Sequence, residues 1–98
     1  MAKFDVYRLG AGPLVIDCQA DLLSDLTTGF VVPLVPSVES WGNVRRLNPT
    51  SPFSGTPHVL LTQEAASLDR RELGARIGSV AEHDLTIANA LDMLISGF

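Results

Sequence analysis

The sequence contains a single cysteine and only two histidines in 98 residues. Cys18 therefore has no partner for an internal disulfide, and a zinc site built on several cysteines is excluded. His58 and His83 stand far apart and in no H-x-x-x-H arrangement, so we expect no metal site. We also expect no cofactor, because the glycine-containing turn at residues 10–13 is not followed by the lysine that a phosphate-binding loop needs.

Positive charge and long apolar runs are also scarce. Seven Lys and Arg against 11 Asp and Glu give a net charge of −4, which repels nucleic-acid phosphates. Arg45 and Arg46 form too small a basic footprint to change this, so no direct nucleic-acid binding is predicted. Asp5 and Arg8 interrupt the N-terminal segment, and no apolar run approaches the ~20 residues of a membrane span. We expect no membrane association and a cytoplasmic location.

Apolar residues are numerous enough for one small core. With 46% hydrophobic positions, the chain predicts one soluble domain over residues 1–98. A domain of this size buries only roughly 60–65% of the surface that its unfolded chain exposes, which leaves a monomer marginally stable. Burial of further surface against a second subunit would add stability, so we expect an oligomer.

Alternation of apolar and polar side chains predicts strands in the first third of the chain. Residues 4–9 follow this period of two, and residues 14–18 are apolar and β-branched. The short Gly- and Pro-containing break between them predicts an antiparallel hairpin. A third strand is expected over residues 30–35, where Pro33 lacks the N–H of a ladder donor and therefore predicts an edge or a bulge.

The middle of the chain is less regular. We expect a short strand over residues 44–47 and a clearer one over residues 57–62. Between residues 62 and 78 a helix-favouring stretch competes with Gly74 and Gly78, so no element is predicted there.

The strongest periodicity lies near the C-terminus. Ser79, with Glu82 three residues later, matches a capping box, and apolar residues then recur at helical spacing. These residues are Ile87, Ala88, Leu91, Leu94 and Ile95. The pattern predicts a helix over about residues 81–95 that Gly97 terminates, with the ring of Phe98 on the final residue.

No group of residues predicts catalysis. Cys18 lies in an apolar strand and is expected to be a buried packing residue. Asp17 and Asp21 lack partners that would assign an acid and a base, and the charged run at residues 69–72 is expected to be a solvated face. The residues alone therefore predict a protein-binding role, with no catalytic residues and no enzymatic activity.

Four segments together resemble the CcdB family, the toxin half of bacterial toxin–antitoxin pairs, in their order and spacing. They are FDVY at residues 4–7, LVIDCQADLL at residues 14–23, VVPL at residues 31–34 and IANALDML at residues 87–94. The resemblance implies a mainly β fold with a C-terminal α-helix, namely a small SH3-like β-barrel that assembles as a homodimer.

The same resemblance implies a target and a second partner. CcdB family toxins bind the A subunit of DNA gyrase and poison the enzyme while its DNA is cleaved. A cognate CcdA-like antitoxin neutralises them by folding its disordered C-terminal half over the toxin. Carried over to this sequence, the gyrase-binding residues are Leu22, Leu23, Asp92, Ile95, Ser96, Gly97 and Phe98.

This chain departs from the family pattern within that set. Ser96 stands where the family has a tryptophan that stacks on a gyrase arginine, a contact that serine cannot make. Phe98 replaces an aliphatic residue and Asp92 replaces an asparagine. Two alternatives therefore stay open: a CcdB-fold toxin that has lost gyrase poisoning and binds its antitoxin or another target, and a MazF-like endoribonuclease. Trp41 is expected to pack in the core.

Overall fold

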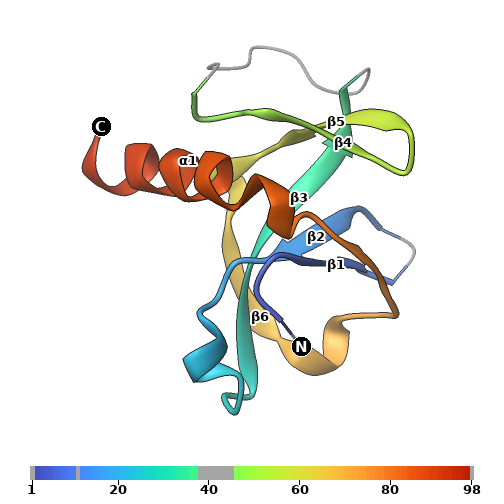
Figure 1. The fold of residues 1–98 in the computed structure, drawn as a ribbon. Coiled ribbons are helices and arrows are strands. Elements are labelled where there is room, and N and C mark those ends of the chain that lie inside the picture. The colour runs from blue at the N-terminus through green and yellow to red at the C-terminus, as the bar shows by residue number, and fades with distance from the viewer. Residues whose placement is uncertain (1, 11, 38–45, 98) are drawn as a thin grey trace.

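The computed structural model describes residues 2–10, 12–37 and 46–97, which form a curled sheet and one long helix (Figure 1). The strands are β1 (Asp5–Arg8), β2 (Leu14–Asp17), β3 (Thr28–Pro36), β4 (Thr50–Phe53), β5 (Thr56–Leu60), β6 (Ala66–Asp69) and β7 (Arg76–Ser79). The helical elements are η1 (Asp21–Leu23), η3 (Thr62–Glu64), η4 (Arg70–Glu72), η5 (Ala81–His83) and α1 (Asp84–Ser96). Trp41, Phe98 and the beginning of the strand expected at residues 44–47 lie outside the described residues.

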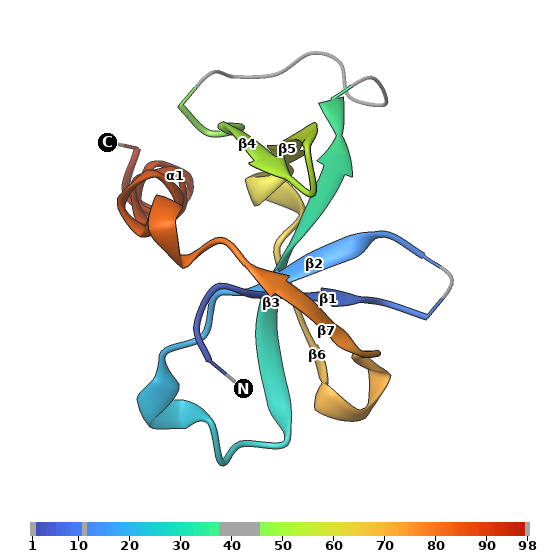
Figure 2. The same ribbon diagram turned by 45° about the vertical axis from the view of Figure 1, so that its right-hand side comes forward.

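The strands form a single antiparallel sheet with neighbours in the order β4-β5-β3-β2-β1-β7, and β6 pairs separately with β3. The sheet curls into a half-barrel around a buried centre, and α1 lies across its open side (Figure 2). The predicted fold class, mainly β with a C-terminal helix, is confirmed. The predicted β1–β2 hairpin and the strand at β5 are also confirmed, with ends that differ by one or two residues.

The concave face of the sheet holds the main core. Val6, Ile16 and Val32 are aligned across β1, β2 and β3 by the strand register, and all three are fully buried. Ile87 of α1 packs against this row. Because side chains alternate between the faces of a strand, Tyr7 and Val15 point to the opposite face, where they form a second and smaller cluster.

Pro33 lies in the centre of the sheet, so the prediction that it marks an edge is wrong. Its strand pairs with β2 along one side and with β6 and then β5 along the other. The carbonyl of Pro33 accepts a hydrogen bond from Leu61 N–H at 3.0 Å on the side of β5. The proline nitrogen faces the same side, at the gap between the paired segments of β6 and β5, where no ladder donor is required.

Residues 62–79, for which the sequence predicts no element, contain two short strands. β6 pairs with the beginning of β3, and β7 pairs with β1. Neither strand shows a clear apolar alternation, and all of their residues are exposed or half-buried. Their conformation therefore depends on the strands that they join.

The predicted C-terminal helix is confirmed, although its first turn is the 3₁₀ turn η5. The predicted capping box of Ser79 and Glu82 is wrong, because the residue that precedes η5 is Val80 and no side chain caps it. Ser79 Oγ instead accepts a hydrogen bond from Ala81 N–H at 3.1 Å, two residues along the chain. Gly97 ends α1 with a φ of 78°, and its N–H donates to the carbonyl of Met93. No helix in the described part of the chain has the length and apolar character to cross a membrane.

The two end strands of the sheet approach each other through one contact. The ring of Phe53 on β4 lies so close to Gly78 on β7 that a Cβ at residue 78 would stand 2.7 Å from the ring. Only glycine leaves room for this approach. Phe53 and Gly78 thus bring the ends of the curled sheet together.

Candidate functional site

The loop between β2 and β3 presents three exposed leucines, one of which is the most exposed large apolar side chain among the described residues. Leu22 is 92% exposed, and Leu23 and Leu26 are about half exposed. We call residues 21–27 the leucine loop; it begins with η1 and projects away from the sheet as the light-blue turn in Figure 1. The exposure of Leu22 and Leu23 leaves both side chains available for the contact that the family resemblance predicts.

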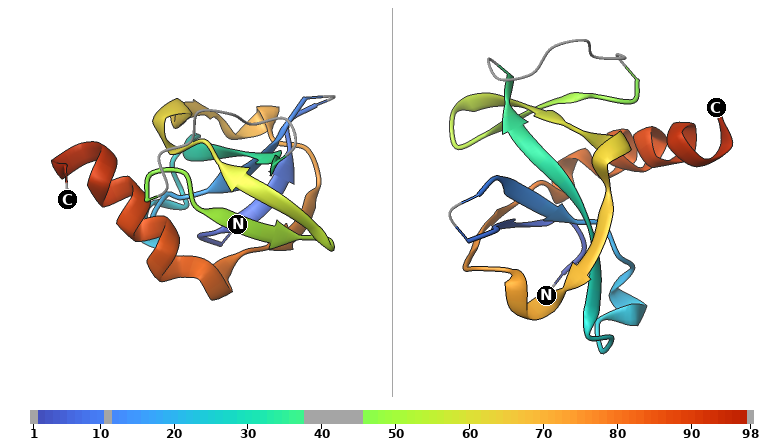
Figure 3. Two further views of the ribbon diagram at one scale, coloured as in Figure 1. Left: turned by 90° about the horizontal axis from the view of Figure 1, so that it is seen from above. Right: turned by 180° about the vertical axis from the view of Figure 1, so that it is seen from behind.

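The end of α1 presents the second predicted group. The helix runs past the edge of the sheet, so its last turn stands clear of the barrel (Figure 3). Ile95 is 77% exposed, and Asp92, Ser96 and Gly97 are also exposed. Leu94 lies on the same helical stripe as the buried Ile87, yet it is 42% exposed because the sheet no longer covers it.

These two groups do not meet within one chain. The leucine loop lies near the beginning of β3, whereas the end of α1 lies towards the other end of the molecule (Figures 1 and 3). A partner that contacts both groups on one copy must therefore span the length of the sheet. Alternatively, a dimer would combine the groups of two copies.

A cavity that the sequence did not predict opens at the end of the barrel opposite the leucine loop. It has a volume of about 410 Å³, and its lining comprises Arg8, Gly12, Pro13, Leu14, Leu34, Val35, Pro36 and His58. The strand register brings these residues together, since Arg8 pairs with Leu14, Leu14 with Leu34, and Pro36 with His58. The lining of this half-open cavity combines polar and apolar surface.

The two polar groups of this cavity differ in character. The exposed guanidinium of Arg8 forms no ion pair with any residue that the structure describes. His58 is only 6% exposed, and its Nδ1 lies 2.8 Å from the carbonyl oxygen of Thr56. Because a carbonyl only accepts hydrogen bonds, Nδ1 carries the proton of this bond, and in the tautomer with one ring proton Nε2 would be an acceptor. The site therefore combines a cation with a hydrogen-bond acceptor.

Charged groups also lie on the opposite face of the β1–β2 hairpin. Asp5 is almost fully buried, and Arg76 Nε lies 3.0 Å from its Oδ2. Burial raises the pKa of Asp5, but the hydrogen bonds from Arg76 and the Ala2 N–H, with the charge of Arg76, outweigh it, and the net pKa is lowered. Burial also acts on Asp17, where the Gln19 N–H and Arg70 compensate only in part, so the pKa of Asp17 is raised.

Cys18 is buried in the main core, as expected. Burial, together with the neighbouring charge of Asp17, raises the pKa of its thiol to about 12. A thiol in this state carries almost no thiolate at neutral pH and is a poor nucleophile. In the described ranges no three His, Cys, Asp or Glu side chains gather in a way that would hold a metal ion.

Comparison with known proteins agrees with the segments described above. The family model described as "CcdB protein" matches residues 3–97, which is nearly the whole chain. The chain belongs to the CcdB family. No curated protein matches the sequence.

Solved structures with the same fold are known from mycobacteria. The Mycobacterium tuberculosis toxin MazF-mt6 is 16% identical, with a TM-score of 0.74, and the match covers 95% of each chain. An endoribonuclease from a mycobacterial species is 17% identical, with a TM-score of 0.77 over 97% of this chain and 90% of that one. Another endoribonuclease, in complex with its cognate antitoxin, is 17% identical, with a TM-score of 0.75 over 97% and 94% of the two chains. At these identities the likeness concerns the fold of this CcdB family member.

These neighbours correct one prediction, that the chain is not an enzyme. Structures with the same fold are named endoribonucleases, so enzymatic activity is found on this architecture. The prediction relied on the absence of a local catalytic motif. Arg8 and His58 are far apart in the sequence and share a cavity only because β1, β2, β3 and β5 are neighbours in the sheet.

Proposed function

We propose that this protein is the toxin of a toxin–antitoxin pair, that it binds the A subunit of DNA gyrase as a homodimer, and that a cognate CcdA-like antitoxin neutralises it. The family match over residues 3–97 and the toxins among the structural neighbours support the toxin role. The observation that carries the gyrase proposal is the exposure of Leu22 and Leu23 at the positions that the family uses for contact.

Homodimer formation is supported by the uncovered part of α1. Leu94 continues the stripe that Ile87 and Ala90 bury in the core, but it projects beyond the sheet. A second copy packed against this part of the helix would cover Leu94. Such burial would add roughly 25 cal/mol for each Å² of apolar surface removed from water. The dimer would also present two helix ends and two leucine loops to one target.

The antitoxin proposal is supported by a structural neighbour that is found in complex with its cognate antitoxin. A disordered antitoxin segment that folds on binding can cover a large surface, although its ordering reduces the net affinity. Exposed apolar side chains such as Leu22 and Ile95 would be shielded by such a segment.

The gyrase proposal is tested with purified protein, gyrase, supercoiled DNA and ATP, followed by detergent. Linear DNA is the expected product, and Ser96→Trp is expected to increase it because the indole ring restores a stacking surface. Leu22→Ala is expected to reduce the product, whereas Leu85→Ala, which removes a side chain of the same size that is also exposed but lies elsewhere, serves as the control. Unchanged supercoiling at high protein excess, with Ser96→Trp equally inactive, would reject gyrase as the target.

A second candidate function, RNA cleavage, is favoured by the cavity that contains Arg8 and His58. Arg8 would bind the phosphate, and His58 Nε2 would accept the proton of the adjacent 2′-OH. The 2′-oxygen would then bond to phosphorus while the bond to the 5′-oxygen breaks and that oxygen takes a proton from water. The products would carry a 2′,3′-cyclic phosphate and a 5′-hydroxyl. DNA, which lacks the 2′-OH, would not react.

Bare RNA incubated with the purified protein tests this candidate. Cleavage is expected to fall by about 10²-fold or more in Arg8→Met and in His58→Asn. Arg71→Met, which removes an exposed arginine remote from the cavity, is the control for general loss of positive charge. Intact RNA at high protein excess rejects the candidate, as does cleavage that survives both substitutions.

A further inference from the structure

The leucine loop has no hydrophobic core of its own. Every residue from Ala20 to Thr28 is exposed, including three leucines. A segment that buries so little normally samples many conformations, because nothing compensates the backbone entropy lost on ordering. Hydrogen bonds from residues outside the loop must therefore supply the stabilisation that burial does not provide.

Gln19 makes the first of these contacts, at the base of the loop. Its side-chain amide nitrogen donates two hydrogen bonds, to the carbonyls of Leu23 and Thr28, each at 3.1 Å. An amide group has two N–H donors, so one side chain serves both acceptors. The two carbonyls lie on the outgoing and the returning arms of the loop. Gln19 thus closes the loop with a single side chain.

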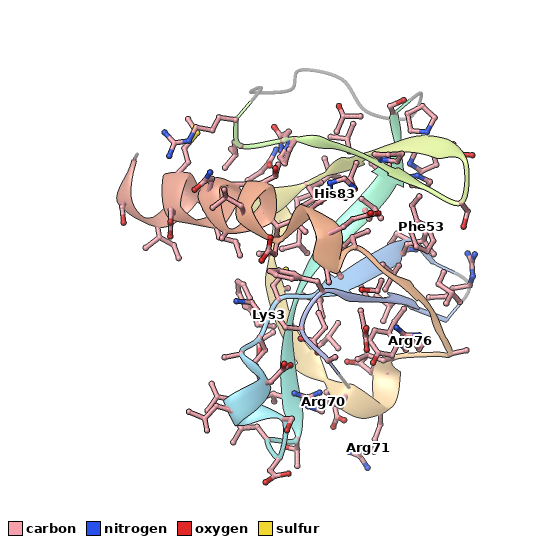
Figure 4. All side chains as sticks on the ribbon, viewed as in Figure 1. Lys3, Phe53, Arg70, Arg71, Arg76 and His83 are labelled. Carbon is pink, nitrogen blue, oxygen red and sulfur yellow. The ribbon has the colours of Figure 1, made fainter. Side chains whose placement is uncertain are left out.

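Arg70 makes the second contact, from a part of the chain more than forty residues away. Its backbone N–H donates to the carbonyl of Thr27 at 2.9 Å, and its Nε donates to the carbonyl of Leu26 at 2.8 Å. Arg70 lies beside the beginning of β3, whereas Arg71, its neighbour in η4, points away into solvent and pairs with Asp69 (Figure 4). The expectation that residues 69–72 form only a solvated face thus fails at Arg70.

A third contact comes from the N-terminal segment. Lys3 N–H donates to Asp21 Oδ1 at 2.6 Å, which fixes the first residue of η1. Within the loop, Leu26 N–H donates to the carbonyl of Leu23, the same carbonyl that Gln19 binds. The contacts from Gln19, Arg70 and Lys3 therefore hold both arms and the start of the loop.

We propose that the leucine loop is a preformed docking element, held in one conformation by Gln19 and Arg70, whose contact surface includes Leu26 as well as Leu22 and Leu23. Gln19 and Arg70 are positioning residues that act through the loop. The docking role rests on the proposed function, because the partner is the A subunit of gyrase, while the positioning role concerns the free protein alone. Preorganisation removes an ordering cost that binding would otherwise carry.

The chemistry of the loop indicates what the partner site must offer. The three leucines of the loop would be buried favourably in an apolar cleft. Asp25 is an exposed carboxylate between Leu23 and Leu26, so it would lie favourably beside a cation or in water at the rim of that cleft. The partner surface for this loop is therefore an apolar groove bordered by Arg or Lys. A purely acidic groove would repel it.

Amide hydrogen exchange of the free protein tests the positioning role. Gln19→Glu keeps the shape of the side chain but replaces both donors with acceptors that face the carbonyls of Leu23 and Thr28. Exchange of the Ser24 and Leu26 amides is expected to accelerate by about tenfold or more, while core amides and the midpoint of urea unfolding stay unchanged. Arg70→Lys, which keeps the charge and the backbone donor but loses the Nε contact, is expected to give the same result.

Matched substitutions serve as controls. Gln63→Glu makes the same chemical change at a residue whose side-chain oxygen only accepts a hydrogen bond, from Asn48. Arg71→Lys makes the same change one residue from Arg70. Neither is expected to alter exchange in the loop. Loop exchange that stays at the wild-type rate in both Gln19→Glu and Arg70→Lys would overturn the positioning role.

Binding to the isolated gyrase A subunit tests the docking role. Leu26→Ala and Leu22→Ala are each expected to weaken binding by about fivefold or more, and Gln19→Glu to weaken it by about tenfold. Leu85→Ala is the control for an exposed leucine outside the loop. If Leu26→Ala binds with wild-type affinity, Leu26 is not part of the contact surface. A wild-type protein that does not bind gyrase refutes the proposed function and this docking role together, whereas the exchange result still decides the positioning role.

Discussion

Asp5 and Asp17 lie near each other on neighbouring strands, yet their environments act on them in opposite directions. Asp5 has an ion pair with Arg76, and its pKa is lowered. Asp17 accepts one backbone hydrogen bond from Gln19 at 3.0 Å, which does not offset its burial, and its pKa is raised. One carboxylate therefore stabilises the fold when charged and the other opposes it.

Each shift has a defined effect on stability against pH. Asp5, with a folded pKa below the unfolded value of about 3.9, contributes stability above that pH, and the contribution is lost as pH falls through the folded pKa. Asp17, with a folded pKa above the unfolded value, favours the fold when protonated. That contribution is present below pH ~4 and is lost as pH rises through the folded pKa.

Asp17→Asn is therefore expected to increase the free energy of unfolding at pH 7 and to change it less at pH 4. The asparagine oxygen still accepts the hydrogen bond from the Gln19 N–H, so the loop base is retained. Asp5→Asn is expected to do the opposite, because it leaves Arg76 without its partner. Urea unfolding of the three proteins at both pH values measures this. Destabilisation by Asp17→Asn at pH 7 would contradict the assignment.

At the scale of elements, the end strands of the curled sheet approach each other where the ring of Phe53 lies against Gly78. The ring of Phe53 occupies the space where any side chain at residue 78 would begin. The same ring meets His58 edge-on, with centroids 6.1 Å apart, so the closure also supports one wall of the cavity. A change at Gly78 should therefore affect both the barrel and the cavity.

Gly78→Ala is expected to lower the free energy of unfolding by about 1–3 kcal/mol, because the added methyl group overpacks the contact with Phe53. Gly29→Ala is the matched control, since a Cβ there meets its nearest neighbour at an ordinary 3.8 Å. Phe53→Leu should absorb part of the loss in the double variant, since neighbouring sites are not additive. Two results together would show that this contact does not close the end strands. Gly78→Ala would lower the free energy of unfolding no more than Gly29→Ala does, and the effects of Gly78→Ala and Phe53→Leu would be additive.

The helix α1 also divides into two parts with different roles. Ile87 and Ala90 lie fully buried against the sheet, whereas Leu94 and Ile95 extend past it. The anchored part stabilises the monomer. The projecting part offers apolar surface to a second copy or to another partner.

At the scale of the whole molecule, this projecting end predicts how two copies assemble. Leu94→Asp is expected to shift the protein from dimer to monomer in sedimentation equilibrium, because it places a charge in the buried interface. Its thermal unfolding at low protein concentration should stay close to that of the wild type, since Leu94 is 42% exposed in the single chain. Ile87→Ala, by comparison, should cost about 2–5 kcal/mol of monomer stability. A wild-type protein that is monomeric at high concentration contradicts the proposed dimer.

Local patterns along the chain were sufficient to predict several elements. The alternation before and after residues 10–13 predicts the β1–β2 hairpin, and the apolar stripe after Ser79 predicts α1, because each signal repeats over neighbouring residues. The four family segments also predicted membership of the CcdB family, because each segment is a short run of neighbouring residues that the sequence itself displays. Burial of Cys18 followed from its place in an apolar strand.

Contacts between distant residues decided the remaining features. Pro33 lies in a central strand because β6 pairs with the part of β3 before it and β5 with the part after it. No local sequence pattern predicts this arrangement. Strands β6 and β7 form because β3 and β1 offer unpaired edges to a weakly patterned segment. Arg8 and His58 line one cavity, and Arg70 reaches the leucine loop, because folding brings together groups that the sequence separates by dozens of residues. Hydrogen bonds and cavities of this kind require residues to be close in space, and these residues become close only when the sheet has formed and curled.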